Sequence, residues 1–195
     1  HVKGHVCSGF GGAIKNLGMG ALTKQTKGDI HTGGEPVFAG DCIHCGMCVD
    51  ACPIHGMMLN PKEKYPVVNN CYGCSTCAIV CPQGVITPKI AFFDTLLAEG
   101  AAAAASTFKK SYYISVMKNI TKNCDCERDS KSIIADDQGY LASTDGVAID
   151  QAAYDVISKH SGEVFEKHNH KKGTEQIIAA EKFGMGKREY RLHTA

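Results

Sequence analysis

The sequence has little excess charge of either sign and no long apolar run. Its 195 residues include 21 Lys and Arg against 20 Asp and Glu, a formal net charge of +1. A surface without a strong positive field gives no electrostatic case for binding nucleic acid. The most apolar tract, 96–106, is interrupted by Glu99 and Gly100, and a membrane helix needs about 18 or more apolar residues. We therefore expect neither a membrane span nor a nucleic-acid partner.

Three further signals are missing. No signal peptide is visible, and no pair of helices suited to DNA binding stands out. The glycine-rich stretch CSGFGGAIKNLGMG, residues 7–20, lacks the GxGxxG spacing and the acidic partner of a dinucleotide-binding fingerprint. The first residue is His1 and not Met, so we expect a fragment, a processed form or the surviving part of a longer sequence.

Cysteine, in contrast, is abundant, with 11 residues in the chain. Eight of them lie in CIHCGMCVDACP, residues 42–53, and its near copy CYGCSTCAIVCP, residues 71–82. In such CxxCxxCxxxCP runs the first three cysteines bind one iron–sulfur cluster, and the fourth binds the other cluster. The predicted ligand sets are therefore Cys42, Cys45, Cys48 and Cys81 for one cluster, and Cys71, Cys74, Cys77 and Cys52 for the other.

A pair of zinc sites is the alternative for these cysteines, although zinc usually takes two CxxC knuckles per site. The block resembles the bacterial two-cluster [4Fe–4S] ferredoxin family at every ligand position, over residues 34–91. The resemblance implies an inserted α+β ferredoxin-type module that exchanges single electrons with redox partner proteins. Free thiolates of this kind also indicate a reducing cytoplasm.

Helix and strand signals alternate on both sides of the block. They predict a strand at 111–120 and two short strand pieces within 132–144, around a turn at 137–139. They also predict helices around 13–23, at 94–108, at 145–162 and at 173–184. The predicted N-caps are Asp94 and Thr174, and Gly162 and Gly184 are expected to end the last two helices. This alternation favours a discontinuous α/β layered domain, 1–33 and 92–195, interrupted by the module at 34–91. The run KHNHKK, residues 167–172, is interpreted as a solvated loop.

Several remaining residues can carry chemistry. Cys124 and Cys126 form a CxC pair and Cys7 is the third spare cysteine; with His5 or His31 they can bind a further metal, or they are simple thiols. We do not expect a disulfide between cysteines so close in sequence, because it would be strained.

The glycine-rich stretch has two interpretations. It cradles an anion at a helix N-terminus, with Lys15 adding charge, or it is a tight turn. Four aspartates can supply carboxylates to the same cleft or act as caps and turn residues: Asp136, Asp137, Asp145 and Asp150.

Four stretches resemble the DUF362 family: GAIKNLGMG (12–20), NCDC (123–126), GYLASTDGVAIDQAAYD (139–155) and FGMGKREYRL (183–192). Members of this family often carry a ferredoxin insert, and their function is undefined. The resemblance covers about the C-terminal half of a typical member, which implies truncation. Members usually have Asp-Pro-Val-Ala where this chain has 145-DGVA-148.

Two functions follow as expectations. The leading one is an electron-transfer protein with two [4Fe–4S] clusters. The rival is an oxidoreductase in which the DUF362-like part holds a substrate or an extra metal and the clusters feed it electrons. Its cleft would be lined by Lys15, Cys124, Cys126 and Asp145, at the carboxyl edge of an open sheet and close to one cluster. A sensor that responds to oxygen is a third option, for which no DNA-binding element is found.

Overall fold

Each strand of the described residues pairs with a single antiparallel partner, so the β-structure there consists of small two-stranded sheets. The computed structural model describes residues 1–130 and 132–194. Its pairs are β1–β2 (Lys3–His5 and Gly9–Gly11), β3–β6 (Pro36–Phe38 and Ile86–Pro88), β4–β5 (Met57–Met58 and Val67–Val68), β7–β10 (Tyr113–Met117 and Gly139–Ser143) and β8–β9 (Ile120–Thr121 and Ile133–Ala135). The expected mixture of helices and strands is confirmed. The expected open sheet is not found in the described residues, so no carboxyl edge exists there to gather a site.

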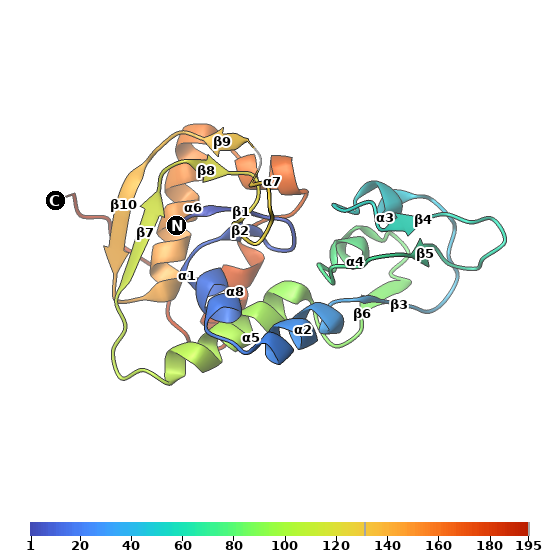
Figure 1. Cartoon of the computed structure of the whole chain (residues 1–195), viewed down its shortest axis with the longest axis horizontal. Helices are drawn as coiled ribbons and strands as arrows, with labels where there is room; N and C mark the ends of the chain where they lie inside the picture. The colour runs from blue at the N-terminus through green and yellow to red at the C-terminus, as the bar shows by residue number, and fades with distance from the viewer. Residues whose placement is uncertain (131, 195) are drawn as a thin grey trace.

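Helices supply most of the packing. They are α1 (Ala13–Lys15), the π-helical turn η1 (Asn16–Gly20), α2 (Lys24–Gly33), α3 (Met47–Asp50), α4 (Thr76–Val80), α5 (Phe93–Ser106), α6 (Gly146–Ser161), α7 (Val164–Asn169) and α8 (Glu175–Lys182). Figure 1 shows α5, α6 and α8 around the N-terminal hairpin. No helix among the described residues is long and apolar enough to cross a membrane.

The cysteine-rich segment leaves this helical body through β3 and returns through β6. These two strands pair antiparallel, with Pro36 opposite Pro88, so the segment begins and ends at the same place. Figure 1 shows it as a separate lobe that contains α3, α4, β4 and β5. The lobe has a small core of its own, in which cysteines pack with aliphatic side chains such as Met57, Val85 and Ile86.

Helix α6 follows the sequence prediction closely. The Asp145 carboxylate accepts the N–H groups of Val147 and Ala148, at 2.8 and 2.9 Å, which makes it an N-cap. Gly162 ends the helix at a φ of +74°, a conformation that favours glycine. The inward face packs into a core with Phe10, Phe165 and their neighbours.

Two predicted elements are divided in the structure. The helix expected at 13–23 stops at Gly20, and a new helix, α2, begins after Thr23, whose hydroxyl accepts the N–H of Thr26 at 3.1 Å. The strand expected at 111–120 breaks at Asn119, which has a φ of +47° and donates its N–H to Asp137 Oδ1 at 2.7 Å. In both cases a short polar side chain starts a turn within an apolar pattern.

Of two predicted caps, the one at Asp94 is wrong and the one at Thr174 is right in position only. Phe92 occupies the N-cap position of α5, and Asp94 is buried in the first turn instead. Thr174 stands at the N-cap of α8 but its side chain makes no capping hydrogen bond.

Lys171 corrects the prediction of a solvated loop at 167–172. Helix α7 ends at Asn169, and His170 at a φ of +55° turns the chain back into the protein. The Lys171 ammonium is buried; it pairs with Asp94 at 2.5 Å and donates to the carbonyls of Cys7 and Cys74, at 2.6 and 2.8 Å. One side chain therefore joins α5, the N-terminal hairpin and the second cysteine run.

Replacement of Lys171 by Met is expected to lower the free energy of unfolding by about 3–5 kcal/mol, because it leaves a buried carboxylate without its partner. Urea denaturation followed by circular dichroism measures this loss. The control is Lys172→Met, an exposed neighbour, for which a change within about 0.5 kcal/mol is expected. Equal losses in the two variants would contradict this role of Lys171.

Candidate functional site

A cavity of about 610 Å³ opens between the helical body and the second cysteine run. The N-terminal hairpin, η1 and α2 form most of its walls. The remaining wall combines the Cys126 region with the loop at Cys71 and Tyr72. The lining residues are His5, Val6, Cys7, Lys15, Asn16, Met19, Gly20, Lys27, His31, Cys71, Tyr72, Cys126 and Glu127.

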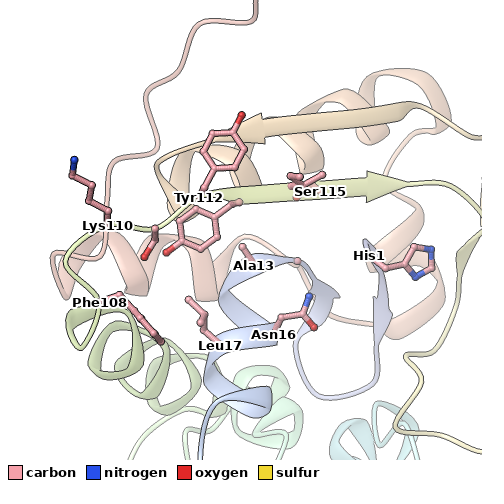
Figure 2. A pocket seen from close by; sticks show the side chains of 12 residues that line it. His1, Ala13, Asn16, Leu17, Phe108, Lys110, Tyr112 and Ser115 are labelled. Carbon is pink, nitrogen blue, oxygen red and sulfur yellow. The ribbon is translucent and has the colours of Figure 1, made fainter.

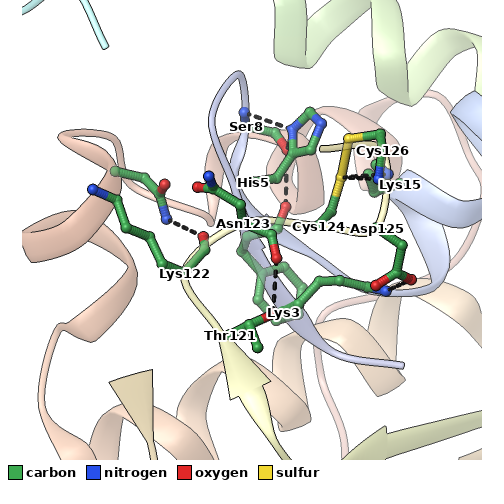
Figure 3. Close-up of a disulfide and its surroundings, with 12 residues drawn as sticks. Lys3, His5, Ser8, Lys15, Thr121, Lys122, Asn123, Cys124, Asp125 and Cys126 are labelled. Carbon is green, nitrogen blue, oxygen red and sulfur yellow. Dashed lines mark hydrogen bonds and ion pairs between the residues drawn. A yellow bond between two sulfur atoms is a disulfide. The ribbon is translucent and has the colours of Figure 1, made fainter. Parts of the chain in front are cut away.

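Cys124 and Cys126 are joined by a disulfide (Figure 3), contrary to the sequence expectation. Their Cα atoms are 5.4 Å apart, within the range of roughly 4.4–6.8 Å that a disulfide spans. A tight turn explains this approach, since the N–H of Glu127 donates to the carbonyl of Cys124 at 3.0 Å. An ion pair between Lys3 and Asp125 fixes the residue between the two cysteines.

The two sulfur atoms have different surroundings. Cys124 is 1% exposed, whereas Cys126 lies at the surface and lines the cavity. Lys15 Nζ lies 3.4 Å from Cys124 Sγ, and the backbone N–H of Cys126 donates to the same sulfur at 3.4 Å. Figure 3 shows Lys15 directed at this sulfur. Burial lowers the pKa of the Lys15 ammonium from its ordinary value.

His5 is the histidine that approaches the CxC pair. Its ligand nitrogen and the two sulfurs lie within 4.8 Å of one another. Burial, followed by the charge of Lys15, lowers the pKa of His5 to about 3, so its imidazole is neutral near pH 7. His31 stands on another wall, where its Nδ1 lies 2.7 Å from the carbonyl oxygen of Tyr72.

Asp145 does not join the cleft predicted with Lys15, Cys124 and Cys126. Besides capping α6, its carboxylate accepts the N–H of Lys187 at 2.9 Å, so both oxygens are used by the backbone. The other three predicted residues do converge. The candidate catalytic role of Asp145 therefore has no geometric support, while Lys15 retains it.

The anion site expected at the glycine-rich stretch is already filled by a side chain. The buried carboxylate of Asp150 accepts the N–H groups of Ala13 and Ile14, at 2.6 and 2.8 Å. A Cβ atom on Gly12 would lie 2.2 Å from Asp150 Oδ1, so the turn requires glycine there. The tight-turn interpretation is therefore correct.

The eight cysteines of the repeated runs are free thiols grouped around two small cavities. Cys42, Cys45, Cys48 and Cys81 line one cavity, and Cys52, Cys71, Cys74 and Cys77 line the other. Each group thus combines three cysteines of one run with the fourth of the other. Four thiols around one space suit an iron–sulfur cluster or a tetrahedral zinc ion.

Backbone amides already point at two of these sulfurs. Gly73 donates to Cys71 Sγ and Gly56 to Cys52 Sγ, each at 3.2 Å. Gly73 has a φ of +63°, and a Cβ there would lie 1.7 Å from the carbonyl oxygen of His31. The close approach of this loop to α2 therefore depends on glycine.

Two other cavities lack this combination of groups. Figure 2 shows one of about 430 Å³ beside β7, where Ala13, Leu17 and Tyr112 contribute to the wall. None of the described residues that line it is a cysteine or a carboxylate. The other, about 610 Å³, lies near α4, α5 and α8, and contains Asp94 and Lys171, which pair with each other.

Comparison with known families adds one finding. The family model described as a domain of unknown function, DUF362, matches residues 1–155. The chain belongs to the DUF362 family. No curated protein and no solved structure matches it.

The DUF362 match includes three of the four stretches on which the sequence resemblance rests, 12–20, 123–126 and 139–155, whereas the fourth, 183–192, lies beyond it. Lys171 lies beyond the matched residues. Its role was missed from the sequence because a lysine between polar residues carries no signal of burial. Asp150 was named only as one of four carboxylates, although its place on the inward face of an amphipathic helix was a usable signal.

Asp150 is expected to make stability depend on pH. Burial raises its pKa to about 7, above the value in the unfolded chain, so the folded protein keeps the proton longer. Stability is then lost as pH rises between about 4 and 7. The variant Asp150→Asn should lack this contribution, so its free energy of unfolding should fall less over that interval. Urea denaturation at constant ionic strength tests it, and parallel pH profiles for the two proteins would contradict it.

Proposed function

We propose that this DUF362 protein transfers single electrons through two [4Fe–4S] clusters held in its cysteine-rich segment. The supporting observation is the division of eight free thiols between two cavities, with the fourth cysteine of each run in the opposite group. When bound, such clusters supply one-electron redox chemistry at low potential. The proposed ferredoxin-type module is the lobe between β3 and β6.

The residues of the chain tune and protect these sites. The amides of Gly56 and Gly73 donate to ligand sulfurs, and hydrogen bonds of this kind raise the potential of a cluster. Lys171 holds the carbonyl of Cys74, which fixes the second run against the helical body. These amide–sulfur contacts and the doubled run favour clusters over the zinc alternative.

Exposed apolar side chains support the proposal that redox partner proteins dock on this module. Apolar side chains are exposed around the first cysteine run: Ile43, Met47, Met58 and Leu59. Electron-transfer complexes are typically small and weak, so a patch of this kind suits a transient donor or acceptor.

An oxidoreductase is the second candidate function, and the cavity beside the CxC pair favours it. There the DUF362 part would hold a substrate, or an extra metal bound by His5, Cys124 and Cys126. Two thiolates and an imidazole suit zinc or copper. His5 Nδ1 accepts the backbone N–H of Ser8 at 3.2 Å, which places the imidazole proton on Nε2, so metal binding through Nε2 requires this hydrogen bond to break. This metal site requires the reduced pair.

Metal analysis is the direct test. Anaerobically reconstituted full-chain protein is expected to contain about eight irons and eight acid-labile sulfides. Four irons or fewer, or stoichiometric zinc in the eight-cysteine segment, would overturn the two-cluster proposal. One additional metal that binds after reduction of the pair, and is lost in His5→Asn, would support the second candidate.

The crossed ligand sets lead to a separate prediction about single cysteine variants. Cys52→Ser should damage the cluster held by Cys71, Cys74 and Cys77, and Cys81→Ser the cluster of the first run. Electron paramagnetic resonance of the reduced protein distinguishes the two signals. Loss confined to the cluster of the mutated run would show that the ligands are not crossed.

A further inference from the structure

The CxC disulfide contributes little to the stability of the fold. It joins residues only two positions apart. A cross-link stabilises a protein by constraining the unfolded chain, and this stabilisation is smaller when the closed loop is shorter. The ion pair of Lys3 with Asp125 and the turn at Glu127 already hold this segment. A different explanation is needed for a disulfide that opens onto a cavity.

The surroundings of the two sulfurs fit thiol–disulfide exchange. Cys126 is exposed on the cavity, so an incoming thiolate can reach its sulfur. Cys124 is buried and receives two hydrogen bonds, from the Lys15 ammonium and from the amide of Cys126, both at 3.4 Å. Donors placed in this way stabilise the thiolate that forms on Cys124 when the bond breaks, and a stabilised thiolate leaves faster.

We propose that Cys124 and Cys126 are a redox-active pair that exchanges with a small anionic thiol, or its disulfide, bound in this cavity. The volume of about 610 Å³ suits a small molecule. Lys15 and Lys27 line the cavity, and Glu127 supplies the one carboxylate among its described lining residues. This balance of charge selects thiols that carry carboxylates over neutral ones.

The exchange balances without another reactant. A substrate thiolate attacks Cys126 Sγ, the bond to Cys124 breaks, and its electron pair goes to Cys124, which becomes the thiolate beside Lys15. A second substrate thiolate then attacks the substrate sulfur of the mixed disulfide and releases Cys126. In total two substrate thiols are oxidised to a disulfide, the protein disulfide is reduced to two thiols, and the two protons pass from substrate to protein.

One wall of the cavity connects this redox-active pair with the proposed iron–sulfur clusters. It contains Cys71 and Tyr72, from the loop of the second predicted cluster. The pair and that loop therefore share one cavity. In the oxidoreductase proposed as the second candidate function, the pair would accept electrons from the cluster or donate electrons to it. This connection rests on the proposed function, whereas exchange with a thiol does not.

Digestion with trypsin allows the redox state of Cys124 and Cys126 to be measured separately from that of the other cysteines. Cleavage after Lys122 and Arg128 releases residues 123–128, NCDCER, which contain both cysteines and no other thiol. Glutathione serves as the anionic probe and 2-mercaptoethanol as the neutral one, each added to the oxidised full-chain protein. Alkylation at successive times followed by mass spectrometry of this peptide gives the rate of reduction, and iron is measured in the same samples.

Wild-type protein is expected to be reduced faster by glutathione than by 2-mercaptoethanol at equal thiolate concentration. Lys15→Met should slow reduction by both thiols about tenfold or more, because a hydrogen bond to a charged group is lost. Lys27→Met should remove the preference for glutathione. Lys24→Met, an exposed lysine of the same helix, is the control and should match the wild type.

A second variant tests which sulfur is attacked. Cys124→Ser leaves Cys126 able to form a stable mixed disulfide with oxidised glutathione, whereas Cys126→Ser leaves only the buried Cys124. The adduct should form at least about tenfold faster in Cys124→Ser, because accessibility governs exchange. Equal adduct rates, or a Lys15→Met rate equal to that of Lys24→Met, would overturn the proposal. Because the peptide is read directly, this result stands whatever the iron content proves to be.

Discussion

The ammonium group of Lys171 holds together the parts of the chain that form the cavity. It is buried with the carboxylate of Asp94, and it also donates to the carbonyls of Cys7 and Cys74. A buried ion is tolerated only when its charge and its donors are satisfied, and here three acceptors from three segments do so. Lys171 therefore helps to fix the second cysteine run against the N-terminal hairpin, together with the contact of His31 with the carbonyl of Tyr72.

A second buried charge organises the other end of the hairpin. Asp150 accepts the first two amides of α1 and thereby fixes the glycine-rich turn from which Lys15 extends toward Cys124. Burial raises its pKa to about 7, which indicates the energetic cost of this arrangement. The sheets are too small to position a site, so buried polar contacts take over the role that a large sheet has in other α/β proteins.

The sequence allowed prediction of elements with strong local signals. Helix α6 has its cap at Asp145, an apolar face and a terminating glycine, and all three were found in place. The turn around 137–139 and the DUF362 resemblance were also confirmed. The grouping of the eight cysteines was predictable from the ligand pattern of such runs, in which a short helix carries the chain from the third cysteine to the fourth.

Features that depend on contacts between distant segments were not predictable. Lys171 meets Asp94 across 77 positions, 171 minus 94, and nothing local marks either residue as buried. The disulfide depends on the turn at Asp125, which is stabilised by Lys3 from the other end of the domain. Asp145 was assigned to the cleft by its position before a helix, yet that position commits its carboxylate to capping.

The central claim is that a cluster-bearing loop and the CxC pair face one cavity. The most direct measurement is diffraction from an anaerobically grown crystal, with data collected at the iron absorption edge. We expect two compact groups of iron, one of them enclosed by Cys52, Cys71, Cys74 and Cys77 next to the cavity that Cys126 lines. Single metal ions at these thiols, or an iron group separated from that cavity by other parts of the chain, would contradict it.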